Sequence, residues 1–99
     1  MNQRAPVPCE EMTAIRQQID ALDVEWVNLL AARQKLIAQA GHAKPERHHI
    51  RDEARIEEVV NLVLQTAQKE GLATEIAEPV WRQLIESSIA YEYRIFDDR

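Results

Sequence analysis

The sequence has very little glycine and proline, with two glycines and four prolines among 99 residues. Few residues are therefore suited to turns, which favours a small number of long helices over many short strands. The chain shows no alternation of apolar and polar residues of the kind that predicts strands, and it contains no internal repeat. A chain of this length is enough for one small domain. We therefore expect a single all-α domain.

Long apolar runs and cysteine pairs are absent as well. Nowhere do ~18 apolar residues follow one another, and the segment MNQRAPVPCEEM contains no apolar core of a signal peptide. These absences predict a cytoplasmic protein that makes no contact with membranes. The single cysteine, Cys9, cannot form an intramolecular disulfide and indicates no redox compartment. Because prolines surround it, we expect a disordered N-terminal tail over residues 1–10, followed by the folded domain over residues 11–99.

Positive charge is not in excess, since the net charge is −5. A general nucleic-acid binder carries a basic face that neutralises phosphates, so this class is disfavoured. No glycine-rich phosphate loop and no Ser/Cys–His nucleophile arrangement is present, and no cofactor is expected. His48 and His49 are adjacent and lack helical ligand spacing or nearby cysteines, so we expect no metal site. Any anionic ligand must be bound by a local cluster of cationic side chains.

The first segment with helical periodicity is unusually long. Its apolar residues run from Met12 to Ala40 at steps of three and four, and Pro8 and Pro45 bound it, which predicts a helix over about residues 11–44. At ~1.5 Å per residue such a helix is about 50 Å long, whereas a compact monomer of this size has a radius of gyration of ~13 Å. The apolar stripe would then stay uncovered on a single chain. A second copy of the chain is the simplest cover, so we expect a homodimer.

Two further helices follow a loop at Pro45–Ile50. The second helix begins near Asp52 and ends at Gly71, a typical C-terminal capping residue. The third carries apolar residues from Ala77 to Phe96, but its start has two candidate positions. Thr74 is a plausible N-cap, whereas Pro79 fits better in the first turn of a slightly later helix.

Charged residues interrupt the apolar stripe of the first helix. Arg33 occupies a stripe position, and Lys44 lies within ~20° of the same face and ~16 Å further along. Their side chains could close around a small anion. Arg16 is ~25 Å before Arg33 and points about 100° away, so it can join such a site only from a second chain. The simpler alternative is that all three are solvated residues at the edges of a helix seam.

Polar residues also interrupt the other two helices. Ser88 and Glu92 are four residues apart on the apolar stripe of the third helix and could project together into a cavity. Asp52 and Arg55, in the first turn of the second helix, could complete its lining. The alternatives are a local Asp52–Arg55 ion pair, a packing role for Ser88 and an edge position for Glu92.

These residues lie in five segments whose order and spacing resemble the all-helical chorismate mutases over about residues 11–97. The segments are IRQQIDALD with Arg16, LLAARQKLI with Arg33, GHAK ending at Lys44, RDEAR at 51–55 and IESSIAYE at 85–92. The resemblance implies a chorismate mutase type II domain over residues 11–99. It implies an intertwined homodimer that converts chorismate to prephenate by an intramolecular Claisen rearrangement, without cofactor or metal, in aromatic amino acid biosynthesis.

The resemblance also assigns roles to the candidate residues. Arg33 and the Arg16 of a second chain would bind the two carboxylates of a small dicarboxylate substrate, for which guanidinium groups are well shaped. Lys44 would donate to the ether oxygen and to a carboxylate. Asp52 and Arg55 would orient the ring end, and Ser88 would contact a carboxylate. Arg33, Lys44 and Glu92 are the candidate catalytic residues.

Two positions depart from the family pattern. Glu92 stands where well-known members have glutamine, and a glutamate donates a hydrogen bond only when protonated. We therefore expect activity to fall as the pH rises and Glu92 loses its proton. Ile56 stands where the common pattern has a glutamate that binds the substrate hydroxyl. This second departure leaves open an isochorismate–pyruvate lyase or an amino-substituted chorismate as substrate, and the remaining alternative is a non-catalytic helical dimer that binds a partner protein.

Overall fold

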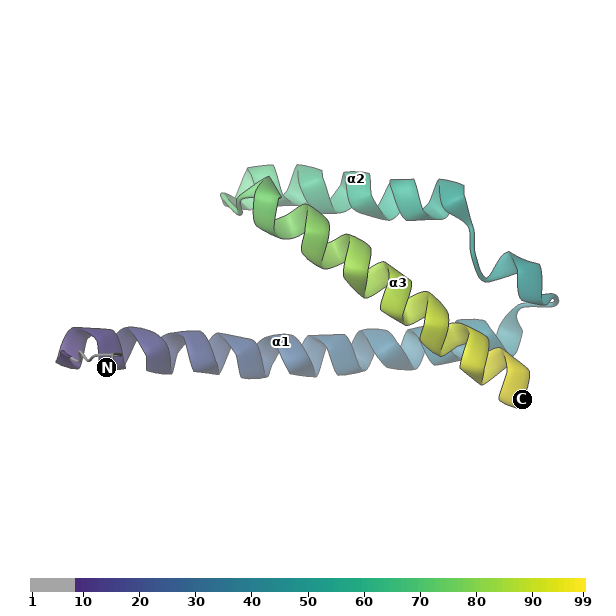
Figure 1. Cartoon of the computed structure of the whole chain (residues 1–99), viewed down its shortest axis with the longest axis horizontal. Coiled ribbons are helices and arrows are strands. Elements are labelled where there is room, and N and C mark those ends of the chain that lie inside the picture. Colours follow the sequence, from purple (N-terminus) through teal and green to yellow (C-terminus); the bar gives the residue numbers. More distant parts are fainter. Residues whose placement is uncertain (1–8) are drawn as a thin grey trace, which may run out of the picture. The chain divides into compact units, whose positions relative to one another are not determined.

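A computed structural model describes residues 9–99, which contain three α-helices, a short 3-10 turn and no strand. The elements in chain order are α1 (Glu10–Ala43), η1 (Arg47–His49), α2 (Glu53–Glu70) and α3 (Thr74–Asp98), as Figure 1 shows. The expected all-α fold with a long first helix is therefore confirmed. The described residues form two compact units, one ending at Arg33 and the other spanning Gln34–Arg99, so α1 belongs partly to each.

The first unit consists of the N-terminal part of α1. The helix begins at Glu10, and Glu10 and Glu11 place negative charge in its first turn, where the helix dipole favours it. Residues 1–8 of the expected disordered tail lie outside the described residues, and Glu10, the last residue of that range, is already helical. Large apolar side chains on this part of α1 are exposed, namely Met12, Ile15, Ile19, Leu22, Val24, Trp26, Val27 and Leu29. A single chain therefore leaves this apolar surface in contact with water.

Helix α2 begins next to Asp52 and ends at Gly71, close to the predicted bounds. The Asp52 side chain accepts a hydrogen bond from the backbone N–H of Arg55 at 3.0 Å, which caps the N-terminus. At the other end Gly71 has a φ of 76°, in the left-handed region that favours glycine. The N–H of Leu72 then donates to the carbonyl of Ala67 at 2.8 Å, which closes the C-terminal turn.

The start of α3 differs from both predicted positions. The helix begins at Thr74, and its N-cap is Ala73, whose side chain makes no capping bond. Pro79 lies in the second helical turn, where it removes one backbone hydrogen bond. Thr74 is therefore not the cap, and Pro79 is not in a first turn. Ala77, which precedes Pro79 by two residues, is buried, with 1% of its surface exposed. Its burial favours a helix that already begins at Thr74.

Helices α2 and α3 are an antiparallel pair with a small apolar core (Figure 1). The core residues are Ile50, Ile56, Val60, Ile85 and Ile89. Trp81, Tyr93 and Phe96 pack against this core from α3. Each such buried side chain contributes about 1.5–3 kcal/mol, so the pairing of α2 with α3 is the main source of stability in the second unit.

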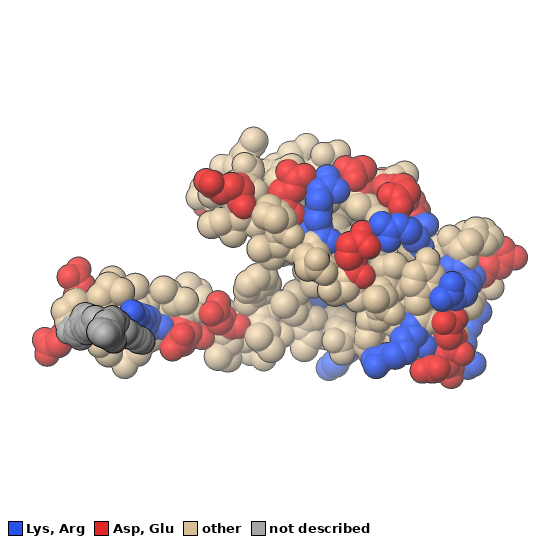
Figure 2. Space-filling model, viewed as in Figure 1, with Lys and Arg blue, Asp and Glu red and all other residues tan. Residues whose placement is uncertain are grey.

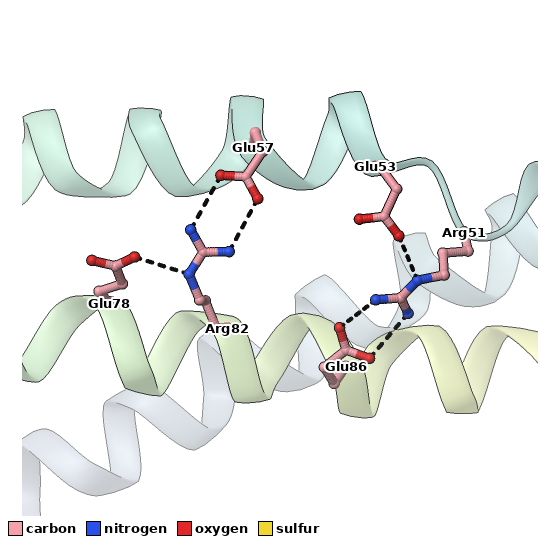
Figure 3. A network of polar contacts seen from close by, with 6 residues as sticks. All are labelled: Arg51, Glu53, Glu57, Glu78, Arg82 and Glu86. Atoms are coloured by element: carbon pink, nitrogen blue, oxygen red, sulfur yellow. Dashed lines mark hydrogen bonds and ion pairs between the residues drawn. The ribbon is translucent and has the colours of Figure 1, made fainter.

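Two arginines join α2 to α3 at the rim of this core, as Figure 3 shows. The Arg82 guanidinium donates to both carboxylate oxygens of Glu57 at 3.1 Å and to Glu78 at 2.9 Å. Arg51 binds Glu86 in the same two-pronged way, at 3.0 and 2.7 Å, and donates to Glu53. Arg82 lowers the pKa of Glu57, and Arg51 lowers the pKa of Glu86, because each guanidinium hydrogen-bonds to the ionised carboxylate.

Charges of both signs are mixed on the surface of the second unit. Figure 2 shows Lys and Arg interspersed with Asp and Glu over the face drawn. On this face of the second unit neither sign of charge forms an extended patch. Among residues 9–99, no helix combines the length and apolarity needed to cross a bilayer.

Candidate active site

An ion pair between a half-buried lysine and a buried glutamate joins the residue after α1 to α3. The Lys44 Nζ atom lies 2.6 Å from Oε2 of Glu92, and the side chains are 30% and 6% exposed respectively. Oε2 receives no hydrogen bond of good geometry, so the nearby ammonium compensates its charge mainly by proximity. Burying a carboxylate without such compensation is very costly. The predicted site residues Lys44 and Glu92 are therefore brought together in the second unit.

Gly41 lets α1 approach α3 closely enough for this pair to form. A Cβ atom on Gly41 would lie 3.0 Å from Cγ2 of Ile95 and 3.2 Å from the backbone oxygen of Glu92. The N–H of Lys44 donates to the carbonyl of Ala40 at 2.9 Å, so helical geometry continues through the Lys44 backbone. Lys44 follows Gly41 by about one turn and is thereby placed on the side facing Glu92. The role of Gly41 is therefore close packing between α1 and α3.

The last turn of α3 contacts the backbone around Lys44. The Arg99 Nη1 atom donates to the carbonyl of Lys44 at 2.7 Å and to that of His42 at 3.1 Å. Further along the loop, Arg47 donates to both carboxylate oxygens of Asp97, at 3.0 and 3.4 Å. Sequence reasoning missed these contacts, because no local pattern links residues some fifty positions apart.

Arg47 also stacks on α3. Its guanidinium carbon lies 4.3 Å from the centre of the Tyr93 ring. Asp97 raises the pKa of Arg47 by accepting hydrogen bonds from its charged form. The guanidinium therefore stays charged. Through Arg47, the loop that follows Lys44 is bound to α3.

Two further positions of interest, Ser88 and Ile56, lie in or against α3. Ser88 is half-buried and lies one turn before Glu92, as its spacing predicted. Ile56, 8% exposed, belongs to the apolar core with Ile85 and Ile89. The position at which the family pattern has a hydroxyl-binding glutamate is thus filled here by a core side chain.

Asp52 and Arg55 are exposed, and the contact between them joins a side chain to the backbone, whereas the sequence suggested an ion pair. Asp52 caps α2 through the backbone of Arg55. The Arg55 guanidinium instead donates to Glu58 at 3.0 Å, one turn further along α2. Because both Arg55 and Glu58 are exposed, this pair contributes little to stability. A role for Asp52 and Arg55 in lining a ligand site stays a prediction.

Arg16 and Arg33 lie in the first unit, on α1. Arg16 is exposed and Arg33 is half-buried. They are seventeen residues apart on one continuous helix, which supports the inference that they cannot serve the same site from one chain. Their roles as carboxylate-binding residues stay predictions.

One group of side chains in the described part of the chain has the composition of a metal site. The ligand atoms of Glu46, His48 and His49 lie within 4.8 Å of one another, and all three residues are exposed. Nδ1 of His48 is 3.3 Å from Oε1 of Glu46. From the two histidines alone we expected no metal site. The structure places the carboxylate of Glu46, the residue before η1, beside them, which the sequence spacing did not indicate.

The described residues therefore form a small all-helical protein. Its polar site, where Lys44 meets Glu92, lies beside an apolar core. The sequence matches the family described as chorismate mutase type II over residues 15–93, and the chain belongs to this family. All seven predicted site residues, from Arg16 to Glu92, lie inside the matched range. Membership supports an enzyme activity of the chorismate mutase kind.

The chain is also similar to a curated protein over most of its length. The chain is 32% identical over 85 residues to the T-protein of Haemophilus influenzae. The match covers 84% of this chain but 22% of that protein, so the chain spans about a fifth of the length of this relative.

Proposed function

We propose that this protein is a chorismate mutase, which converts chorismate to prephenate by an intramolecular Claisen rearrangement in aromatic amino acid biosynthesis. The observation that carries the proposal is the Lys44–Glu92 pair, with Nζ 2.6 Å from a carboxylate oxygen of a side chain that is 6% exposed. A buried ion pair of this kind contributes little net stability compared with apolar packing, so a role in chemistry explains its presence better than a structural role.

The proposed reaction breaks the ether C–O bond of the substrate and forms one C–C bond within the same molecule. It requires a site that holds the reactive conformer and stabilises negative charge growing on the ether oxygen. Lys44 donates a hydrogen bond from Nζ to that oxygen. Protonated Glu92 donates a second hydrogen bond to it from the opposite helix. Arg33 and the partner's Arg16 bind the two substrate carboxylates, and Ser88 contacts one of them.

In the absence of substrate, Lys44 and Glu92 compensate each other's charge. When the ether oxygen takes its place between them, Glu92 acts as a donor only if it carries a proton. Asp52 and Arg55 are placed at the ring end in this proposal, and no cofactor or metal takes part.

A homodimer is part of the proposal. The exposed apolar residues of the first unit, among them Leu22 at 63% and Leu29 at 69%, support a second copy of the chain as the cover for α1. Arg16 lies on this same stretch of α1 and would be contributed to the partner's site across the interface. The proposed location is the cytoplasm.

A second candidate is an isochorismate–pyruvate lyase, which forms salicylate and pyruvate. It is favoured by Ile56, because a core isoleucine supplies no hydrogen-bond acceptor for a ring hydroxyl. An amino-substituted chorismate is compatible with the same absence. The third alternative, a helical dimer that only binds a partner protein, requires no intact Arg33.

Product analysis separates these functions. Purified protein is incubated with chorismate and, in a second reaction, with isochorismate, and the products are separated and quantified. Prephenate from chorismate supports the proposal. Salicylate and pyruvate from isochorismate, without prephenate, would assign the lyase activity. If neither substrate reacts although the dimer is folded, the binding-module function is favoured, and Arg33→Ala should then leave partner binding intact.

A further inference from the structure

We propose that Arg99 is a positioning residue that fixes Lys44 opposite Glu92, an inference that rests on the proposed function of this pair. Arg99 touches none of the proposed reacting groups. Its Nη1 atom donates to the carbonyls of Gly41, His42 and Lys44, at 3.4, 3.1 and 2.7 Å. The shortest of these bonds is to Lys44 itself.

The end of α1 requires a donor of this kind. The last four carbonyl groups of a helix have no partner within it, and the negative end of the helix dipole favours a cation there. Since α1 ends at Ala43, Gly41 and His42 carry carbonyls of this unpaired set. Arg99 satisfies them from another helix, so it fixes the direction in which the chain leaves α1 as well as capping it.

Arg99 is held in turn by the helix that carries Glu92. Its guanidinium carbon lies 3.7 Å from the centre of the Phe96 ring. Phe96 is partly buried against the core of α2 and α3, and it follows Glu92 by four residues, which places it about one turn further along α3. One helix therefore positions both the Glu92 carboxylate and the backbone from which Lys44 projects.

The side chain of Lys44 needs such a fixed base. A lysine has four flexible methylene groups and loses considerable rotamer entropy when held in one place. Lys44 is also 30% exposed, so its ammonium can be solvated by water if the backbone shifts. A displacement of ~1 Å in a catalytic group can reduce the rate about a hundredfold. Loss of the Arg99 contacts is therefore expected to reduce turnover without removing any group that touches the substrate.

The test compares Arg99→Gln with Arg99→Lys and with Arg94→Gln. Arg94 is the control because it is an exposed arginine of α3 that lies five residues before Arg99. Its guanidinium carbon lies 5.1 Å from the centre of the Tyr91 ring. For Arg99→Gln we expect kcat with chorismate to fall about ten- to a hundredfold, with KM changed less than about threefold. Arg99→Lys should recover part of the loss, because it keeps a cationic donor. Arg94→Gln should stay within about twofold of the parent protein.

A second measurement does not depend on turnover. The ¹⁵Nζ resonance of Lys44, assigned with Lys44→Met, reports directly on the ion pair with Glu92. We expect Arg99→Gln to shift this resonance toward that of an exposed lysine and Arg94→Gln to leave it in place. Circular dichroism and thermal unfolding show whether each variant is folded under the conditions used.

The outcomes separate the two proposals. If kcat falls and the Lys44 resonance moves, Arg99 is a positioning residue. An unmoved resonance in folded Arg99→Gln overturns the inference, whether or not kcat changes, and so does an unchanged kcat. If the parent protein does not act on chorismate, the proposed function fails, and a shifted resonance in Arg99→Gln still establishes that Arg99 positions Lys44.

Discussion

Gly41 and Ile95 lie so close together that a single added methyl group could not be placed between them without displacement. A Cβ atom on Gly41 would be 3.0 Å from Cγ2 of Ile95, and it would also be 3.2 Å from the Glu92 backbone oxygen. The isoleucine side chain can rotate, but the carbonyl belongs to the backbone of α3. A side chain at position 41 would therefore require the neighbouring atoms of α3 to move by a few tenths of an ångström.

We predict that Gly41→Ala destabilises the protein and reduces its activity. Overpacking costs ~1–3 kcal/mol, while alanine in place of glycine inside a helix gains up to ~1 kcal/mol, so a net loss of about 1 kcal/mol is expected. The displacement of α1 from α3 should also lower kcat. Thermal unfolding and steady-state kinetics with chorismate measure the two effects.

Gly71→Ala is a matched control for this substitution. Gly71 has a φ of 76°, and a Cβ atom there would meet no atom within 4 Å. A side chain in this left-handed conformation costs ~1–2 kcal/mol, so the stability loss is similar but arises from backbone strain. Because the turn after α2 does not contact Lys44 or Glu92 by any described interaction, kcat should be unchanged. Equal losses of kcat in both variants would refute the packing role of Gly41.

Glu92→Gln should change the pH dependence of catalysis. Glutamine donates a hydrogen bond at every pH, whereas glutamate does so only in its protonated form. We therefore expect the parent protein to lose activity as the pH rises and the variant to keep its activity toward alkaline pH. The measurement is kcat/KM from pH 5 to about 9 for both proteins. Superimposable profiles would remove Glu92 from its proposed donor role.

Removing one member of the Lys44–Glu92 pair should destabilise the protein more than removing both charges. Breaking a fully buried pair costs ~3–5 kcal/mol, and the loss for Lys44→Met should be smaller because Lys44 is 30% exposed and water reaches it. In the double variant with Glu92→Gln no charge is left buried, so most of that loss should be recovered. Urea unfolding of the three variants measures the coupling. Additive losses would show that the two side chains do not interact in solution.

The ion pairs between α2 and α3 predict a loss of stability in acid. The pKa values of Glu57 and Glu86 are lowered from 4.5 by hydrogen bonds from Arg82 and Arg51. Folding therefore favours the ionised carboxylates; this stabilisation is present above the unfolded pKa of about 4.5 and is lost as the pH falls through the lowered folded values.

Urea unfolding at pH 7 and at lower pH tests this loss. Glu57→Gln combined with Glu86→Gln should reduce the dependence of stability on pH below about 4.5. Glu70→Gln is the control, because Glu70 makes no ion pair with the described residues. The contribution of the two pairs is contradicted if the double variant and Glu70→Gln show the same acid dependence.

Mixed dimers test whether Arg16 acts across the interface. Arg16→Ala and Lys44→Met chains are each expected to be inactive alone. If Arg16 serves the partner's site, a mixed dimer contains one site with both residues intact, so an equimolar mixture should recover about a quarter of the parent activity. If Arg16 acted within its own chain, both sites of the mixed dimer would be defective and no activity would return.

Local sequence signals predicted most of the helix boundaries. The periodicity from Met12 to Ala40 gave α1 to within about one residue at each end. Helix α2 begins next to Asp52 and is capped by Gly71 at its C-terminus, as predicted. The start of α3 was wrong because burial of Ala77 outweighs the preference of Pro79 for a first turn. The burial of Ala77 depends on which helix packs against the start of α3, and the local sequence does not contain this information.

The sequence singled out Lys44 and Glu92 but did not predict their contact. Lys44 and Glu92 were singled out as charged residues near apolar stripes and by the family resemblance, yet a distance of 2.6 Å between two helices follows from neither. The close contact at Gly41 and the carbonyl contacts of Arg99 depend on tertiary packing. Such contacts carry no periodic signature, so only the folded chain shows them.

The most direct test of the account is the effect of Lys44→Met on the conversion of chorismate to prephenate. Lys69→Met, on an exposed lysine in the last turn of α2, is the matched control. We expect Lys44→Met to lower kcat/KM by about a hundredfold or more while the protein stays folded, and Lys69→Met to leave it within about twofold. Folded Lys44→Met protein with the activity of the Lys69→Met control would show that Lys44 takes no part in the reaction.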